Sequence, residues 1–495
     1  MDGRSFATKS QFMRPKGANK LVNETVGGKM KKAWEIAYDL YSNAKPVLLS
    51  EEEQGWEPLK AVADFYDNML RLEWHSNVPG SGAPEQLMVA AIQALENRGY
   101  TVENGYELLD KGMRLYEEGN NAELQKISAE LRNEFKNAKK DFSSPYWEFT
   151  YYENFGQYEK KVEFPKEVEV DTKTEIFQDK IKAAWMSQFI GAAMGTMVEG
   201  YTSKNLYETF GDVKDYLRKP NTYNDDITFE IAFLDAFKDK GYDVTSKDIA
   251  LSWIGLIPAG WSAEEIALKN IRSGLLPPDS AIFNNPFSEW IGAQMRGGIC
   301  GMVAPGNPKL AAHLAWKDGQ VSHINNGILG EIFNAVMTSL AFVENDVKKI
   351  VESAISMIPS DSEYYSVIKF AYDSCLKHNN WQDAHKECQE KYIKYNWIHA
   401  YPNACCEIIA LMYGDGDYEK TLNIITMCGV DADCNGGMIM PILGIQKGMS
   451  IIPQRLISPA FDLLITYMRK YEEIKLEELV NDTIKYINEA KLRRN

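Results

Sequence analysis

The sequence predicts an all-α protein in which a compact multi-helix bundle follows a smaller helical domain. Apolar residues recur at helical spacing through most of the chain, as in Trp34, Ala37, Tyr38 and Tyr41. Runs that alternate like strands are scarce, and glycine and asparagine interrupt the helical pattern at intervals. At 495 residues the chain is too long for one ordinary core, so we expect two or three domains.

The chain divides into four segments by composition. Residues 1–29, rich in Lys, Asn, Gly and Ser, predict a flexible leader, and residues 30–141 predict an α-helical accessory domain without a catalytic constellation. Residues 142–173 are dense in aromatics and predict a linker strapped against the larger domain, or alternatively a lid that stacks an adenine. Within them Glu167–Asp171 alternates like a short strand. Residues 174–495 predict the main domain.

The main domain reads as nearly continuous helix with short breaks. Gly191 and Gly195, four residues apart in an apolar helix, predict a close helix crossing in the core. Further helices are expected near residues 226–240, 246–257, 262–273, 307–317, 326–342, 345–356, 361–377, 402–413, 417–428, 435–448 and 474–490.

Composition excludes several classes of function. A formal net charge of −16 argues against general nucleic-acid binding and against an anionic membrane as partner. The sequence contains no run of 18 apolar residues, so no membrane span is expected, and no signal peptide is evident at the N-terminus. All seven cysteines lie between Cys300 and Cys434 without zinc-finger spacing, which predicts reduced thiols and a cytoplasmic protein. A catalytic cysteine is the alternative, but no Cys–His pairing points to one.

Two acidic clusters about 200 residues apart are the strongest candidates for a site. Asn224-Asp225-Asp226 and Asp431-Ala432-Asp433-Cys434-Asn435 each open a predicted helix. If the fold brings them together, four short carboxylates suit a hard cation, and the absence of an adjacent His favours Mg²⁺ or Mn²⁺ over Zn²⁺. The alternative is that each cluster simply caps its helix, since Asn and Asp are common there and suit the helix dipole.

Five segments in a fixed order resemble the motifs of the ADP-ribosylglycohydrolase family, which includes the dinitrogenase reductase-activating glycohydrolase and the ADP-ribosyl-acceptor hydrolases. The order and the span, about residues 175–490, make the resemblance specific. The segments are Gly191–Glu199, Asp225-Asp226, Trp290–Arg296 with Pro305–Pro308, Asp318–His323, and Gly429–Gly437.

The resemblance implies an ADP-ribosylglycohydrolase-like bundle that binds two Mg²⁺ ions, with Mn²⁺ as the alternative. It implies Glu199 and Asp433 as catalytic residues and Gly292, Arg296 and His323 as substrate-binding residues. The implied metal ligands are Asn224, Asp225, Asp226, Asp431, Asp433 and Cys434.

Three positions depart from the family pattern. Asn224 and Cys434 stand where Ser or Thr is common, and Ala192 stands where many members carry Asp. An amide oxygen can bind Mg²⁺, whereas a thiol is a soft and poor ligand for it. The N-D-D and D-x-D-C-N motifs together resemble a bacterial branch of the family.

Two substrate-binding assignments also have structural alternatives. The Arg296-Gly297-Gly298 segment suits a diphosphate-binding turn, or else glycines at a helix crossing with Arg296 in an ion pair. His323 suits either a substrate contact or a histidine that caps the helix near 326–342.

The implied activity is hydrolysis of the C1″ glycosidic bond of an ADP-ribosyl group on a protein, a nucleic acid or a small molecule, so the expected partner is an ADP-ribosylated substrate. A site rich in carboxylates suits the oxocarbenium-like transition state of that reaction. The alternatives are a weakened ADP-ribose-binding pseudoenzyme, marked by Asn224 and Cys434, or a metal-dependent nucleoside or phosphoester hydrolase.

Overall fold

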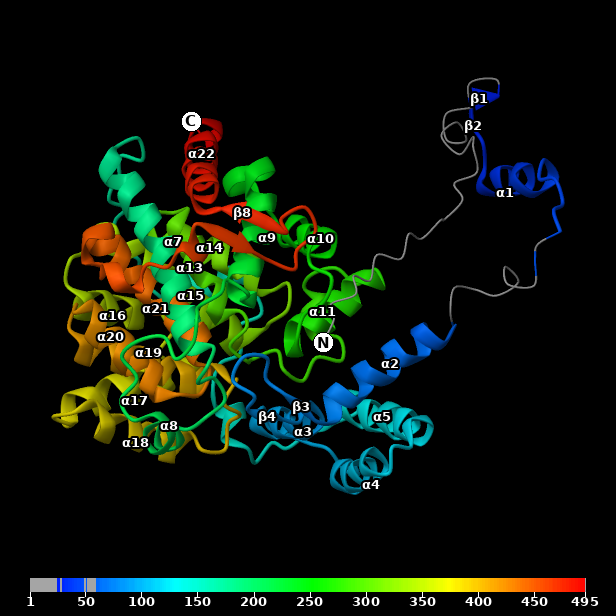
Figure 1. Cartoon of the computed structure of the whole chain (residues 1–495), viewed down its shortest axis with the longest axis horizontal. Helices are drawn as coiled ribbons and strands as arrows, with labels where there is room; N and C mark the ends of the chain where they lie inside the picture. Colours follow the sequence, from blue (N-terminus) through cyan, green and yellow to red (C-terminus); the bar gives the residue numbers. More distant parts are fainter. Residues whose placement is uncertain (1–24, 27–28, 49, 51–58, 495) are drawn as a thin grey trace. The chain divides into compact units, whose positions relative to one another are not determined.

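The computed structural model describes residues 25–26, 29–48, 50 and 59–494 (Figure 1). These residues form the helices α1 to α22 and four small two-stranded antiparallel sheets, which confirms the predicted all-α class. Most of the predicted leader, residues 1–29, lies outside the described residues. The chain separates into two compact units, residues 1–66 and residues 67–495.

The first unit holds a hairpin and one complete helix. Strand β1 (Thr25–Val26) pairs antiparallel with β2 (Lys29–Met30), and α1 spans Ala33–Ser42. The Lys32 N–H donates to Glu35 Oε2 at 2.6 Å, which closes the first turn of α1. Helix α1 buries none of its side chains, and Trp34 and Tyr38 of its apolar face are exposed.

The second unit begins with a small helical layer that has its own core. Its helices are α2 (Leu59–Trp74, which starts in the first unit), α3 (Leu87–Asn97), α4 (Gly105–Glu117) and α5 (Asn121–Lys136). Trp74 is fully buried at the centre and donates its indole N–H to Ser128 Oγ at 2.8 Å. Two antiparallel strand pairs join the layer. Strands β3 (Ser76–Asn77) and β4 (Pro84–Glu85) form a hairpin, whereas β5 (Tyr100–Thr101) and β6 (Lys139–Lys140) pair across the two helices between them. The layer stands where the accessory domain over residues 30–141 was predicted, but it shares one compact unit with the bundle, and α3 also packs into the main core, so a separate domain stays a prediction.

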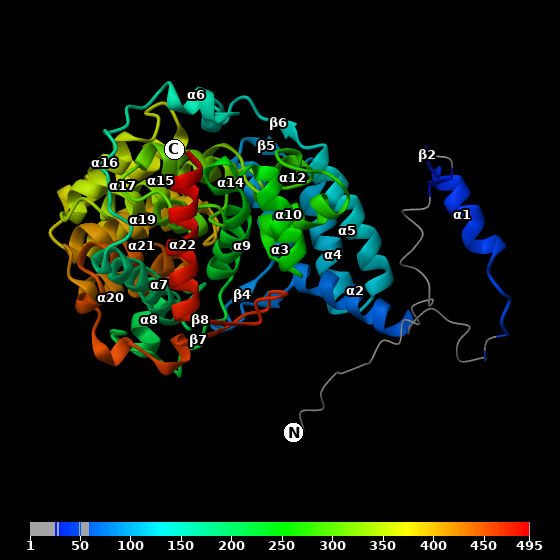
Figure 2. The ribbon, with the colours of Figure 1, turned by 90° about the horizontal axis from the view of Figure 1, so that it is seen from above.

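Residues 142–173 run along the bundle as an extended segment that includes α6 (Phe155–Glu159), seen at the edge of the bundle in Figure 2. The Tyr158 hydroxyl donates to the Met357 carbonyl at 2.8 Å, and the Phe155 ring stacks on His313 at 4.5 Å. These contacts fit a strap. The strand predicted over Glu167–Asp171 is absent: the segment is extended, but its backbone bond to the bundle is from Val168 N to Gly306 O, so no ladder forms.

The main bundle contains all eleven helices predicted between residues 226 and 490, each within four residues of its expected ends. Strand β7 (Leu463–Ile465) pairs with β8 (Glu473–Lys475) before the last helix. The helices are α7 (Glu175–Gly195), α8 (Ser203–Phe210), α9 (Asp225–Lys240), α10 (Ser246–Leu256), α11 (Ser262–Arg272), α12 (Asp279–Ile282), α13 (Gly297–Met302), α14 (Pro308–Gly319), α15 (Asn325–Ala341), α16 (Val347–Ser356), α17 (Glu363–Lys377), α18 (Trp381–Tyr392), α19 (Ala400–Gly414), α20 (Tyr418–Cys428), α21 (Ala432–Lys447) and α22 (Leu476–Arg494).

Helices α7 and α21 cross at backbone contact in the middle of the bundle (Figure 1). A Cβ atom placed on Gly191 would lie 2.2 Å from the Gly436 carbonyl oxygen, and one on Gly195 would lie 2.1 Å from the Asp433 nitrogen. No side chain fits in either place. The close crossing predicted from Gly191 and Gly195 is therefore confirmed, and it fixes the start of α21 against the end of α7.

In the part of the chain that the structure describes, no helix combines the length and the apolar character needed to cross a lipid bilayer.

The glycine contact yields a stability prediction. Gly191→Ala should lower the free energy of unfolding by about 1–3 kcal/mol, because the new methyl group overlaps the Gly436 backbone and the helices must separate. Gly255→Ala is the matched control: Gly255 is exposed near the end of α10 with nothing within 4 Å of a new Cβ, so it should be neutral or stabilising. Urea unfolding of both variants checks this, and equal effects would contradict the tight crossing.

Candidate functional site

A cavity of about 550 Å³ opens where three chain segments meet: the turn after α7, the start of α9 and the start of α21. Its size is that of an ordinary small-molecule site. Several residues predicted for the site line it together: Glu199, Asn224, Asp225, Gly292, Asp431, Asp433 and Cys434.

The two acidic clusters converge on Cys434. Ligand atoms of Asp225, Asp226 and Cys434 all lie within 4.8 Å of one another, and so do those of Asp431, Asp433 and Cys434. The glycines after Cys434 make this possible, since a Cβ on Gly437 would lie 3.0 Å from Asp226 Oδ2. The structure thus brings together two pairs of carboxylates that lie about 200 residues apart in the sequence.

Backbone hydrogen bonds hold the second cluster beside Glu199. Gly200 N donates to Val430 O at 2.8 Å, and Val430 N donates to Tyr201 O at 2.9 Å. Val430 has φ of 53°, a left-handed conformation that a β-branched residue rarely adopts, and it turns the chain into Asp431. The turn after α7 and the loop before α21 are therefore one unit of backbone structure.

Helix capping accounts for some of the polar residues and not for others. Asn224 is the N-cap of α9, and its Oδ1 accepts from Ile227 N at 3.3 Å, so its side-chain oxygen already serves the helix. Asp431 holds the N-cap position of α21 but makes no capping hydrogen bond with its side chain. Its N–H donates to Asn403 Oδ1 at 3.2 Å, which leaves the carboxylate turned to the other acids.

The buried carboxylates lack positive partners. Burial and the neighbouring Asp433 and Asp431 raise the pKa of Glu199 well above its ordinary value, and burial together with Asp225 raises the pKa of Asp433 to about 6. Both carboxylate oxygens of Asp226 and one of Asp431 are buried without a hydrogen-bond partner. Among the described residues that line the cavity there is no Lys, Arg or His. Buried carboxylate oxygens without hydrogen-bond partners are suitable ligands for a hard divalent cation.

Arg296 belongs to a different, fully buried network. Its guanidinium pairs with Asp318 and donates to Glu264 Oε1 and Ser322 Oγ, each at 3.0 Å. Trp253 lies under it, 4.8 Å from guanidinium carbon to ring centroid. Arg296 does not line the cavity, and a contact with a bound diphosphate would require it to leave these carboxylates. Its substrate-binding role stays a prediction that this geometry does not favour.

His323 and Gly292 differ in their relation to the cavity. His323 is fully buried next to the Arg296 network, with Nδ1 2.7 Å from Ser322 Oγ, and it is not among the lining residues. Burial and Arg296 hold its pKa well below the ordinary value, so the imidazole is neutral. Gly292 does line the cavity, and its carbonyl accepts from Arg296.

Sequence reasoning missed one wall of the cavity. The β3–β4 hairpin contributes Ser76, Asn77 and Glu85, and the Trp261 indole N–H donates to Glu85 Oε2 at 2.8 Å. Aromatic side chains of Trp397 and Tyr467 complete the lining. No local pattern marks these residues, because they come from four separate segments that only the tertiary fold assembles.

A family model described as ADP-ribosylglycohydrolase matches residues 173–490, well over half of the chain. The chain belongs to this family. A solved structure titled "ADP-ribosylglycohydrolase-related protein complex" is similar at 17% identity and a TM-score of 0.46, covering 63% of this chain and 98% of that one. Comparison with curated proteins finds no match.

The buried guanidinium yields a prediction that separates its two roles. Arg296→Met should lower the free energy of unfolding by about 3–5 kcal/mol, because Asp318, Glu264 and the nearby Glu331 lose the guanidinium that pairs with them. Arg114→Met, which removes an exposed pair with Asp110, should cost less than about 1 kcal/mol. Thermal unfolding measures both. A normally stable Arg296→Met protein with weakened nucleotide binding would instead place the guanidinium on the ligand.

Glu85 yields a pH prediction. Burial raises its pKa to about 7 from an ordinary 4.5, so above pH 7 the folded protein carries a buried negative charge that the unfolded chain would hold in water. Glu85→Gln keeps the acceptor for Trp261 and removes that charge. It should be more stable than the parent by about 3 kcal/mol at pH 8, with the difference disappearing below about pH 4.5. Urea titrations across this range test it, with Glu118→Gln on the exposed end of α4 as a control that should match the parent throughout.

Proposed function

We propose that the protein hydrolyses the C1″ glycosidic bond of an ADP-ribosyl group with divalent cations held by Asp225, Asp226, Asp431 and Asp433. The observation that carries the proposal is the convergence of these acids from the starts of α9 and α21. Asp225, Asp431 and Asp433 line a cavity without a basic residue among its described lining residues, and the buried Asp226 lies next to Asp225 and Cys434. Carboxylates alone would repel the diphosphate of the substrate, and bound cations remove that repulsion. Family membership supports the choice of ADP-ribosyl linkages.

The donor set fits Mg²⁺ better than a soft metal. Asp226 and Asp431 offer buried oxygens without partners, and oxygen ligands are those that Mg²⁺ and Mn²⁺ prefer. The Cys434 thiol is the exception, since it lies among the carboxylates yet is a poor ligand for a hard ion. We therefore assign the metal to the four Asp residues and regard Asn224, whose oxygen caps α9, as a residue that positions the helix.

The chain's own residues divide the chemistry between binding and proton transfer. When bound, the cations would hold the ribose hydroxyls and a water molecule. In hydrolysis the water oxygen bonds to C1″, the bond to the acceptor breaks with its electron pair, and the acceptor gains a proton. Glu199 lines the cavity beside the metal ligands and is placed to transfer that proton, while Asp433 orients the attacking water. Trp261, Trp397 and Tyr467 supply flat apolar surface for the adenosine.

The proposal predicts that Asp431→Asn shifts stabilisation by Mg²⁺ to much higher Mg²⁺ concentrations, because loss of one carboxylate lowers the charge and the number of ligands. We expect affinity for Mg²⁺ to fall on the order of tenfold to a hundredfold. Melting temperatures measured with increasing Mg²⁺ test this, with Asp110→Asn as the exposed control that keeps the full response. An unchanged Mg²⁺ response in Asp431→Asn would remove the acid from the metal site.

Activity is tested with a panel of ADP-ribosylated arginine, serine, nucleic-acid and small-molecule substrates, assayed for free ADP-ribose with and without Mg²⁺. We expect Mg²⁺-dependent release that falls about 10²–10⁴-fold in Glu199→Gln, while that variant keeps its Mg²⁺ response. Tight ADP-ribose binding without release would identify a pseudoenzyme instead. Release of phosphate from nucleotides would identify a phosphoester hydrolase.

Cys434 yields a prediction about the affinity of the site for Mg²⁺. Cys434→Ser exchanges a soft sulfur for a hard oxygen of similar shape, so it should tighten Mg²⁺ binding by about tenfold. Cys434→Ala, which removes the donor, should leave Mg²⁺ binding as it is in the parent. Calorimetric titration of both variants decides the matter, and equal affinities in all three proteins would exclude position 434 from the coordination shell.

A further inference from the structure

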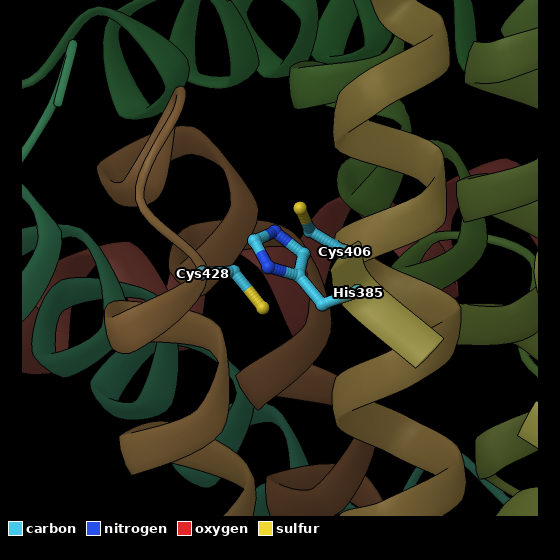
Figure 3. A group of neighbouring side chains, drawn as sticks. All are labelled: His385, Cys406 and Cys428. Carbon is cyan, nitrogen blue, oxygen red and sulfur yellow. The ribbon is translucent and has the colours of Figure 1, made fainter. Parts of the chain in front are cut away.

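A second group of ligating side chains lies outside the lining of the acidic cavity, where three helices meet. His385 of α18, Cys406 of α19 and Cys428 of α20 place one ligand atom each within 4.8 Å of the others. Figure 3 shows the imidazole ring between the two thiol groups. All three residues are at most 3% exposed. None of them was assigned a role from the sequence.

The imidazole of this group has an unmet bonding requirement. His385 Nε2 is buried without a hydrogen-bond partner, although buried ring nitrogens are normally paired. Its neighbours are sulfur atoms, which are weak hydrogen-bond partners and strong ligands for soft or borderline metals. A metal ion would satisfy the nitrogen and both sulfurs at once.

We infer that His385, Cys406 and Cys428 form a binding site for one Zn²⁺-class ion, separate from the carboxylate site. Imidazole and thiolate are the usual ligands of Zn²⁺, and two thiolates neutralise its charge, which suits burial. Two sulfurs bound to tetrahedral zinc lie about 3.8 Å apart, and since the ligand atoms here lie within 4.8 Å of one another, closing the site needs movements of at most about 1 Å. Three protein ligands leave one position for a small ligand such as water.

The site has a consequence for the acidic loop. Cys428 is the last residue of α20 and lies three residues before Asp431. Cys406 lies one turn after Asn403 on α19, and Asn403 Oδ1 accepts from Asp431 N at 3.2 Å and from Asn435 Nδ2 at 2.7 Å. An ion joining the three helices would therefore stiffen both supports of the loop that carries Asp431 and Asp433.

Zinc content of the full-length reduced protein tests the assignment. Protein is loaded with Zn²⁺ in excess Mg²⁺, which occupies the carboxylate site, then exchanged into zinc-free buffer and measured by mass spectrometry of the metal. We expect one zinc per chain in the parent and in Asp431→Asn. Cys405→Ala is the control and should also bind one zinc, because Cys405 is a neighbouring buried thiol outside the group. Cys406→Ala and Cys428→Ala should bind zinc at least about a hundredfold more weakly. Because Asp431 belongs to the proposed Mg²⁺ site, zinc retention in Asp431→Asn would show that the zinc site does not depend on the hydrolase proposal.

A second measurement needs no variant. Co²⁺ added to the parent protein should produce the thiolate-to-metal charge-transfer band and the visible bands of a tetrahedral site, and Zn²⁺ should remove them. The inference is overturned if the parent binds neither metal, or if both Cys variants retain zinc. It is also overturned if peptide mapping finds a Cys406–Cys428 disulfide in place of a metal.

Discussion

The contact between α7 and α21 is the constraint on which the site depends. Gly191, Gly195 and Gly436 let two backbones touch, and at this separation the first turn of α21 lies directly against the end of α7. Glu199 follows that end, and Asp433 belongs to that first turn. The positions of the two acids are therefore set by main-chain packing, which is stiffer than any arrangement made by long side chains. A reaction that needs carboxylates at fixed separations benefits from this backbone contact, because it limits how far the two acids can move apart.

The bundle contains two groups of buried acids, and they differ in whether a basic side chain balances their negative charge. Asp318, Glu264 and Glu331 surround Arg296, whose guanidinium supplies several donors at once. The acids around Cys434 have no such residue, and oxygens of Asp226 and Asp431 stay unpaired. The first group has a cation from the protein itself, although Asp318 Oδ2 and Glu331 Oε2 are also buried without a hydrogen-bond partner. The described residues that line the cavity give the second group no basic side chain, and this difference in charge is the main physical reason for proposing it as a metal site.

Helix positions followed from the sequence because periodicity reports burial, and the helix expected at 226–240 is seen at Asp225–Lys240. Helix α18 was missed although Trp381, His385, Cys388 and Tyr392 form a buried stripe, since polar residues dominate its composition. The strand expected at Glu167–Asp171 failed because alternation cannot supply a pairing partner. Motif order located the four Asp residues. Glu85 and Trp261 could not be located, because a wall shared by distant segments leaves no local signal.

The β3–β4 hairpin gives the cavity a part that lies outside the segment matched by the family model. That segment begins at residue 173, whereas Ser76, Asn77 and Glu85 line the same cavity from far upstream. A chain cut at residue 172 would keep every carboxylate proposed for the metal and lose one side of the chamber around the ligand. Part of the cavity wall and the carboxylates proposed for the metal are therefore encoded in different stretches of one polypeptide. Exchanging the hairpin between relatives would therefore change the shape of the cavity and leave the carboxylates in place.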